Sequence, residues 1–519
     1  MRSLGASDPL LDEIGRAGPT SKKKFRNVSR NFHAWINRTK KVLPVKVSTV
    51  KLRVLERRPR LKQVEKNFPM IGLKSWAEYL LEHSPKFLLA GHSLEDHGYE
   101  ETFRLFWERY FKLDGNHPVY QNFNESSWGS LVPYCLHGDE GRGKAKRPVL
   151  ITSYQMIIPQ EGLGETNMKG HSFTTRLLAS IMPSQLMTSK DETLDDMNRF
   201  MVDDLKDCFY EGVQARSIVK GHTIRFIYLG CKGDWPYLRK IMNLASGFRS
   251  KRLCHMCAET DWWTFGEKKS CLHNWDPVNT PLPWKRNRSL LLNLPGAECP
   301  MRTRVDLAHT WAIGAGKDFC ASAIVALCRL GVFGAGTMPA RLDRAHDHFT
   351  EWCYFAKQHV QVKDFTLRSL KVTSLQQYPV LSGKGHDCIV VHKWLSFVCG
   401  QCQPDSLDQS HRDFFDVLKY TADCGNIWFR ELYKHGIFIP SHIGAGVAPM
   451  AWGLTEGYGC LASMSTDRRW VLFRVKPKLH MHEHVAHLGT YTGGYARYTR
   501  VQNVGCTGNK WSQRSLFEA

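Results

Sequence analysis

The stretch HTIRFIYLGCKGDW, residues 222–235, decides the prediction of the fold. Its apolar run from Ile224 to Leu229 is typical of a buried β-strand, and glycine and aspartate follow directly after it. A carboxylate at the end of a buried strand can point into a cleft that the neighbouring loops complete. We therefore expect Asp234 to lie at a functional strand end.

The segments before this strand predict the rest of an α/β fold. Short apolar, β-rich segments occur at 130–141, 147–158 and 171–183, and residues 193–213 have the period of an amphipathic helix. Asp139 stands at the end of the first of these strands, as Asp234 does at the end of the fourth. Two carboxylates at neighbouring strand ends suit Mg²⁺ or Mn²⁺, whereas the alternative is two unrelated loop acids of the kind common beside glycine.

The composition is that of a basic, globular protein. The chain has 519 residues, of which 42% are hydrophobic and 11% aromatic, enough for the cores of several domains. Lys and Arg (71) exceed Asp and Glu (49) by 22, which indicates a polyanionic partner: DNA first, with RNA as the alternative. The apolar stretch 319–336 is broken by Arg329 and does not predict a membrane span. We expect the nucleus, or failing that the cytoplasm, with the sixteen cysteines as thiols or metal ligands.

The positive charge is concentrated near the N-terminus. Residues 21–66 contain 16 Lys or Arg and two Glu, without a clear hydrophobic period. We expect residues 1–68 to form a basic flexible arm that contacts phosphates, although a solvated linker is the alternative. The predicted nucleic-acid-binding residues are Lys22, Lys23, Lys24, Arg26, Arg57, Arg58 and Arg60. Two helix-like patterns within residues 69–125 predict a small helical domain after the arm.

A pair of cysteines follows the strand with Asp234. The motif CHMC places Cys254 and Cys257 at a spacing that lets both sulfurs bind one tetrahedral zinc ion. Two pairs of residues could complete the site: the nearby Cys271 and His273, or the distant His480 and His484, which would share one face of a helix. The alternative for the histidines is a His-rich helix without a metal.

One further pair of residues has the spacing of a metal site. Asp306 and His309, in RVDLAHTWAIGAGKDF (304–319), are separated by one helical turn. They could form an orienting hydrogen bond or add to a metal site, and the alternative is a structural role.

Taken together, these motifs resemble the DDE transposases of the CACTA and related groups. The resemblance rests on the order of a strand with Asp139, two more strands, a helix and a strand followed by GDWPYLRKIMNLASGF (233–248), and on the Cys-x-x-Cys pair and the Asp-x-x-His motif. HGDEGRG, KGDWPYLRK, CHMC and VDLAHTWAIGAGKDFCASA resemble still more closely a multicopy dinoflagellate-type protein family, over most of residues 70–490. What the first resemblance implies is a ribonuclease-H-like core, formed by a mixed sheet flanked by helices and interrupted by a large, mainly helical insertion with a zinc site.

The resemblance also assigns residues. It implies Asp139 and Asp234 as the first two acids of a two-metal nuclease or strand-transfer site, with magnesium or manganese, and structural zinc on Cys254, Cys257, His480 and His484. The domains it implies are the first part of the core at 126–248, the insertion at 249–475, and a His-rich segment with a degenerate or truncated core end at 476–519. Oligomer formation is compatible with this reading.

The sequence departs from the family where the third acid belongs. After Glu483 the only acidic residue is Glu518, and the tail from Gly489 is rich in glycine. Either the third acid is lost or the chain is truncated, or else Glu483 or Glu351 replaces it; we take Glu483 as the candidate. With two acids alone we expect DNA binding without metal-dependent cleavage. If another residue replaces the third acid, the chain would be a Mg²⁺-dependent DDE-type transposase or nuclease. The alternative function is a zinc-stabilised nucleic-acid-binding protein without nuclease ancestry.

Overall fold

The protein divides into two compact units, Met1–Lys46 and Val47–Ala519. The computed structural model describes residues 38–39, 44–57, 59–142, 148–164, 175–214, 223–247, 250, 252–257, 282–372, 374, 376–402 and 407–491. All elements named below belong to the second unit.

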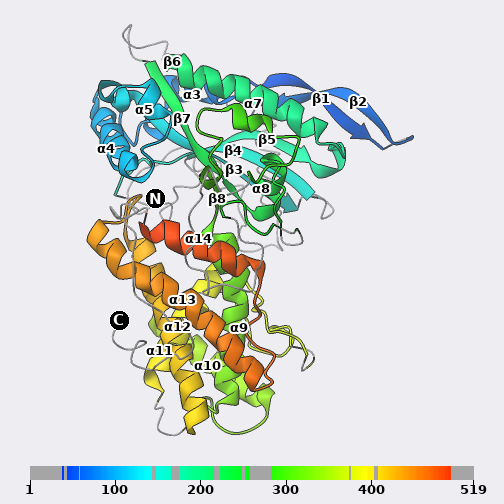
Figure 1. Cartoon of the computed structure of the whole chain (residues 1–519), viewed down its shortest axis with the longest axis vertical. Coiled ribbons are helices and arrows are strands. Elements are labelled where there is room, and N and C mark those ends of the chain that lie inside the picture. The colour runs from blue at the N-terminus through cyan, green and yellow to red at the C-terminus, as the bar shows by residue number, and fades with distance from the viewer. Residues whose placement is uncertain are drawn as a thin grey trace. The chain divides into compact units, whose positions relative to one another are not determined.

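A mixed sheet forms the centre of the first part of this unit (Figure 1). Its strands are β3 (Leu131–Arg142), β4 (Pro148–Met156), β5 (Arg176–Pro183) and β7 (Thr223–Gly233), with the short strands β6 (Val213–Gln214) and β8 (Thr303–Val305). The order is β5-β4-β3-β7, in which β3, β4 and β5 are antiparallel and β7 runs parallel to β3. The strand β6 pairs antiparallel with the start of β7, and β8 pairs parallel with its end. The predicted α/β sheet is therefore present.

The burial pattern of β7 fits its position inside the sheet, between β3 and the short strands β6 and β8. Ile224 and every residue from Phe226 to Cys231 are buried, as expected for a strand covered on both faces. The helix α7 (Glu192–Tyr210) precedes β7 and packs on it, burying ten of its 19 residues. The short helix α8 (Trp235–Ile241) begins directly after β7 and packs on β3 and β7.

The helices before the sheet belong to the same core as the sheet. They are α3 (Leu73–His83), η2 (Pro85–Phe87), α4 (Gly98–Leu113), α5 (Val119–Asn122) and η3 (Glu125–Ser130). Their aromatic side chains, such as Phe103 and Trp107, share one hydrophobic cluster with the strands. The predicted helices are confirmed, but a separate helical domain at 69–125 is wrong, because these amphipathic helices bury their apolar faces against the sheet.

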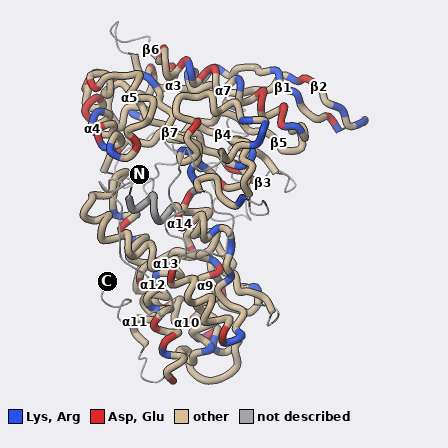
Figure 2. The backbone as a smooth tube through the Cα atoms, in the orientation of Figure 1, with Lys and Arg blue, Asp and Glu red and all other residues tan. Residues whose placement is uncertain are grey.

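The basic segment is a β-hairpin from Ser48 onward. The strands β1 (Ser48–Glu56) and β2 (Lys62–Met70) pair antiparallel, and Figure 2 shows Lys and Arg along them. Leu52 and Val54 are buried in the core, whereas Lys51 and Arg53 alternate with them on the other face, an alternation that the dense charge obscures in the sequence. Arg53 also donates two hydrogen bonds to Asp196 on α7, at 2.7 and 2.9 Å. The prediction of a flexible arm is therefore wrong for 48–68, and residues 1–37 lie outside the described part.

The second part of the unit is helical and has a core of its own. Its elements are η9 (Ala308–Ala315), α9 (Gly316–Arg329), α10 (Met338–Phe355), α11 (Gly385–Gln401), α12 (Gln409–Lys434) and α13 (Ser441–Asp467). Short helices η6 (Ser184–Leu186), η7 (Leu290–Asn293) and η8 (Pro300–Arg302) lie outside this core. The stretch Ala308–Arg329 is long and apolar enough to cross a membrane, but 89% of its most apolar window is buried in the protein, as in a core helix.

The helix α14 (Pro477–Tyr491) contributes to both cores. Leu479 belongs to the cluster of the helical part and Met481 to the cluster of the sheet. On the same helix, the ring of His482 lies 4.7 Å from the ring of Trp311 and 5.0 Å from the ring of Trp428. This helix therefore brings the end of the described chain to the sheet, whose strand β7 ends more than 200 residues earlier in the sequence.

Candidate functional site

The two predicted aspartates lie side by side because of the register of β3 and β7. Gly138 is the parallel partner of Gly233, so Asp139, within β3, and Asp234, directly after β7, follow paired positions. Their carboxylates and a ring nitrogen of His309 all lie within 4.8 Å of one another. The expected convergence of Asp139 and Asp234 is confirmed, although β3 does not end at Asp139: it continues to Arg142 along β4.

Two glycines allow this close approach. A Cβ atom on Gly138 would lie 2.0 Å from the ring of Tyr237, whose backbone N–H donates to Asp234. Gly233 has φ +158°, and a Cβ there would lie 2.2 Å from the carbonyl oxygen of Gly138. Any side chain at either position would push β7 and α8 away from β3, because packed interiors leave no such space. The Gly-Asp pairs of the two motifs thus have a common structural reason.

The cap of α8 orients Asp234. Its carboxylate accepts a hydrogen bond from the backbone N–H of Tyr237 at 2.8 Å, as an N-cap residue does. Burial raises the pKa of Asp234, the hydrogen bond from Tyr237 lowers it, and the nearby charge of Asp139 raises it again, so that the pKa lies above its ordinary value. Two acids that repel each other in this way are relieved by a shared cation.

His309 is held in place by Asp306. The backbone N–H of His309 donates to Asp306 at 2.7 Å, and Nδ1 of its ring lies 2.8 Å from the other carboxylate oxygen. This hydrogen bond raises the pKa of His309 more than burial lowers it. The predicted orienting hydrogen bond is confirmed, and it leaves Nε2 as the ring nitrogen for a metal ion, the arrangement found in carboxylate–histidine–metal triads.

Basic side chains border this acidic cluster. Burial lowers the pKa of Arg176, at the start of β5, although the negative charges of Asp306 and Asp139 raise it in part. Lys232 on β7 is influenced by Asp306 too, and burial lowers its pKa as well. An acidic centre with a basic border has the charges to suit a substrate that carries both a phosphate and a bound metal ion.

The candidate third acid does not join the cluster. Glu483 is fully buried on α14 and is not among the residues whose ligand atoms meet at Asp139 and Asp234. The helix turns about 100° per residue, so with His480 and His484 facing the cysteines Glu483 points elsewhere. Glu351 is exposed on α10 and is not part of the cluster either. Glu518 lies outside the described residues.

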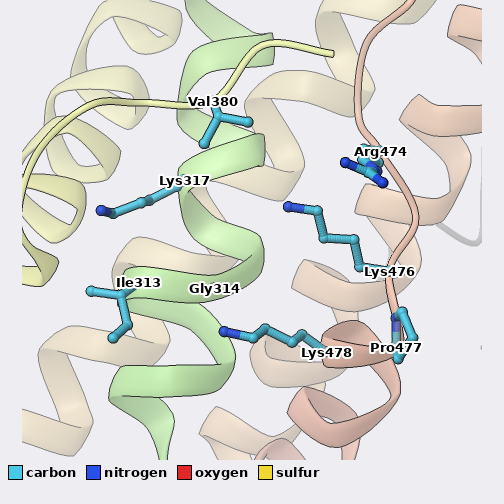
Figure 3. A pocket seen from close by; sticks show the side chains of 8 residues that line it. All are labelled: Ile313, Gly314, Lys317, Val380, Arg474, Lys476, Pro477 and Lys478. Atoms are coloured by element: carbon cyan, nitrogen blue, oxygen red, sulfur yellow. The ribbon is translucent and has the colours of Figure 1, made fainter. Parts of the chain in front are cut away.

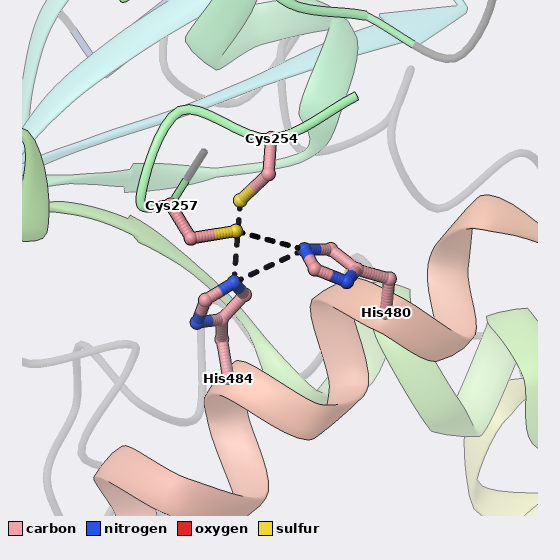
Figure 4. Close-up of side chains that lie close together, drawn as sticks. All are labelled: Cys254, Cys257, His480 and His484. Atoms are coloured by element: carbon pink, nitrogen blue, oxygen red, sulfur yellow. Dashed lines mark hydrogen bonds between the residues drawn. The ribbon is translucent and has the colours of Figure 1, made fainter. Parts of the chain in front are cut away.

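A second cluster contains the predicted cysteines and histidines (Figure 4). Cys254, Cys257, His480 and His484 are all buried, and their ligand atoms meet within 4.8 Å. Sγ of Cys254 lies 3.3 Å from Nε2 of His484, Sγ of Cys257 lies 3.4 Å from Nε2 of His480, and the two Nε2 atoms are 3.2 Å apart. Tetrahedral zinc with bonds of about 2.0–2.3 Å separates its ligands by roughly 3.3–3.7 Å. The cluster could hold a metal ion and is consistent with zinc.

The loop of the cysteines is already shaped for thiolates. The backbone N–H of Met256 donates to Sγ of Cys254 at 3.2 Å. The two thiols differ: burial raises the pKa of Cys254, but hydrogen bonds from Cys257 and the backbone outweigh it and lower the pKa, whereas the hydrogen bond with Cys254 and burial raise the pKa of Cys257. This is the behaviour of a pair in which one sulfur loses its proton first, and a metal ion would remove the second.

The cysteine loop is anchored to the sheet next to the first cluster. His255, between the cysteines, is fully buried, and its Nε2 lies 2.5 Å from the carbonyl oxygen of Thr303 on β8. Asp306 follows β8 directly. The strand β8 thus connects the two clusters through the backbone.

Several predicted residues lie elsewhere. Arg57 and Arg60 are exposed at the turn of the β1–β2 hairpin, where they can meet a partner. Cys271 and His273, the alternative ligands, lie outside the described residues, as do Lys22, Lys23, Lys24, Arg26 and Arg58.

The described residues therefore form two groups with the chemistry of metal ligands, one acidic and partly exposed, the other thiol–imidazole and buried. No signal in the sequence set His309 apart from other histidines except its spacing from Asp306. Comparison with models of protein families gives no match for this chain, and comparison with curated proteins gives none either.

Proposed function

We propose that the chain is a DNA-binding protein derived from a DDE-type transposase, and that Asp139, Asp234 and His309 hold a divalent metal ion at which a phosphodiester bond is cleaved or transferred. One observation carries the proposal: three ligand atoms from three separate segments meet within 4.8 Å beside the ends of β7 and β8. Isolated loop acids have no reason to be brought together with a histidine that a fourth residue orients.

The topology supports a ribonuclease-H-like core. Three antiparallel strands, the helix α7 and then β7 parallel to the first strand follow the order that the resemblance implies, and β8 adds parallel to β7. The helical part, from η9 to α13, lies in the sequence between β8 and α14, where the resemblance implies an insertion.

The residues of the cluster have separate tasks in this proposal. A bound divalent ion would stabilise charge on the phosphate and lower the pKa of an attacking water or hydroxyl. Asp139 and Asp234 supply the negative charge that holds the ion. Asp306 keeps the ring of His309 in the orientation that leaves one nitrogen for the ion. Arg176 supplies positive charge at the border for the phosphate.

The ligand set favours manganese over magnesium. Mg²⁺ prefers oxygen ligands in octahedral geometry, whereas later divalent ions accept imidazole. The sequence, without a third acid, predicts no cleavage. Because His309 occupies a third ligand position in the cluster, we expect weak cleavage that depends on Mn²⁺.

We assign the buried cluster of Cys254, Cys257, His480 and His484 to structural zinc. Four buried ligands leave no open position for a substrate, as in structural zinc sites. The ion would tie α14 to the loop after α8, and so hold the end of the helical part against the sheet.

Nicking of supercoiled plasmid DNA by the purified full-length chain tests the function. We expect nicking with Mn²⁺, less with Mg²⁺, and loss on the order of 100-fold in Asp234→Asn and in His309→Ala. Asp343→Asn, which removes an exposed acid on α10, is the matched control and should nick like the wild type.

The alternative function is a zinc-stabilised DNA- or RNA-binding protein without nuclease ancestry. The observation that favours it is the four-ligand cluster, which serves folding whether or not the acids bind a metal. Tight binding of nucleic acid with one zinc ion per chain, no nicking with any divalent ion and no manganese binding that depends on Asp234 would establish this alternative.

A further inference from the structure

A pocket lined by basic residues lies in the helical part, outside both clusters (Figure 3). Its volume is about 310 Å³, and four of its eight lining residues are cations. They are Lys317 at the start of α9, Arg474 and Lys476 in the segment that leads into α14, and Lys478 in the first turn of α14. Three basic residues at alternate positions, together with a fourth from another helix, place an unusual density of positive charge around one space.

Only part of this charge is neutralised inside the protein. Lys476 donates to the fully buried Asp318 at 2.5 Å, which pairs one cation. Lys317 donates instead to the backbone carbonyl of Gly383. Lys317, Arg474 and Lys478 form no ion pair with a carboxylate of the described residues. Like charges at such short range repel one another unless an anion lies between them.

The pocket borders the acidic cluster. Gly314, which lines it, belongs to η9, where π-type hydrogen bonding and non-helical dihedrals (φ −111°, ψ −119°) interrupt the helix. A Cβ on Gly314 would lie 2.5 Å from the carbonyl oxygen of His309 and 3.1 Å from Cδ of Lys478. The aliphatic part of Lys478 therefore passes next to the backbone of a residue of the cluster. The charges of Asp306 and Asp234 also reach the ammonium group of Lys478.

We propose that Lys317, Arg474, Lys476 and Lys478 bind a backbone phosphate of the DNA strand, next to the phosphate at Asp139, Asp234 and His309. This inference rests on the proposed function, which it extends by naming the residues that hold the substrate strand. A cluster of cations without a metal ligand positions phosphates and carries no information on the base sequence. The occupant is a phosphodiester of a strand, because Gly314 and Lys478 connect the pocket to the backbone of His309, beside which the next phosphate of the same strand would lie.

The test measures DNA affinity without Mg²⁺ or Mn²⁺, so that it does not depend on cleavage. Fluorescence anisotropy with a labelled duplex, between about 50 and 200 mM salt, compares the wild type with Lys317→Gln/Arg474→Gln. Lys476 is left intact because its removal would leave Asp318 buried without its cation. The control is Lys363→Gln/Arg368→Gln, two exposed cations between α10 and α11.

We expect the pocket variant to bind about tenfold more weakly near the middle of this range and to show a salt slope smaller by about two, since each phosphate contact contributes about 0.9. The control pair should change the slope by less than half as much. In Lys478→Met, which keeps the stem beside Gly314 and whose zinc content should equal that of the wild type, the slope should fall by about one.

Two results would overturn the inference. Equal slopes for the pocket and control variants, with native thermal unfolding, would show that no strand phosphate lies there. The second result is that the pocket variant loses pyrophosphate binding but binds DNA like the control. It would assign the pocket to a small phosphate compound instead. If either result occurs together with Mn²⁺-dependent nicking that Asp234→Asn abolishes, the proposed function stays intact. A salt slope that is reduced in the pocket variant, without any nicking by the wild type, would support the pocket and reject the nuclease.

Discussion

At the scale of single residues, hydrogen bonds decide which side chains can serve as ligands. Asp306 accepts from both the backbone and the ring of His309, so it is a positioning residue for His309. Asp234 is oriented in the same way by the backbone of Tyr237. Asp139 is exposed, and the register between β3 and β7 sets its position.

The zinc assignment is testable at this scale. In the double variant His480→Ala/His484→Ala we expect the zinc content of the purified protein to fall from one ion per chain to none, because two sulfurs alone cannot complete a tetrahedral site. Measurement by atomic absorption after dialysis decides it, with the exposed His97→Ala as the control.

The alternative ligands give the opposite outcome. Zinc that stays in the His480→Ala/His484→Ala protein and leaves in Cys271→Ser/His273→Ala would assign the site to the local residues. The meeting of Cys254 and Cys257 with α14 would then be a consequence of packing alone.

At the scale of elements, the contact between β3, β7 and α8 sets the geometry of the acidic cluster. Gly138 and Gly233 lie so close to Tyr237 and to each other that the three elements behave as one piece. Tyr237 itself is fully buried, so its ring cannot move away from an added methyl group.

We therefore expect Gly138→Ala to lower the free energy of unfolding by about 3 kcal/mol, the upper range for overpacking of a core, and to weaken manganese binding by separating Asp139 from Asp234. Urea unfolding and a metal titration measure the two effects. Gly400→Ala is the control: nothing lies within 4 Å of a Cβ there, and helix α11 should gain up to about 1 kcal/mol from it. A Gly138→Ala protein as stable as the wild type would contradict the close packing of Tyr237.

At the scale of the whole molecule, the basic charge is divided between the N-terminal segment and the folded unit. Residues 21–43 contain eight Lys or Arg and no acidic residue. The hairpin β1–β2 adds basic side chains on an element that is anchored by Leu52, Val54 and Arg53. Removing the hairpin would therefore damage the core, whereas the segment before residue 44 belongs to the other compact unit.

Deletion of residues 1–43 should leave the thermal unfolding of the remainder unchanged and reduce the salt slope of duplex DNA binding by several units, since each lost phosphate contact accounts for about 0.9. Salt-dependent anisotropy and circular dichroism measure the two quantities. A full-length chain with the eight cations changed to Gln is the control for charge, and it should match the deletion. An unchanged slope in both proteins would show that the folded unit alone binds DNA.

Local patterns in the sequence predict the main strands and helices between residues 73 and 233 and the pairs of candidate ligands. Buried strands, amphipathic helices and the spacing of ligand residues are set by periods of two to about four residues, which can be read without knowing the fold. Asp139 and Asp234 were predicted to meet for this reason, because chain order predicts neighbouring strands. The hairpin at 48–70 was missed, since lysine and arginine at its exposed positions mask the short apolar alternation.

Contacts between distant segments were decided only by the tertiary structure. His480 and His484 reach Cys254 and Cys257 because α14 packs between two cores, whereas the spacing of the residues alone also allowed the nearby Cys271 and His273. His309 becomes the third member of the acidic cluster because β8 pairs with the last residues of β7, a contact of three residues too short for any sequence period to predict. Glu483, the expected third acid, is buried by that same helix, since the energy of packing both cores fixes which face of α14 meets the cysteines.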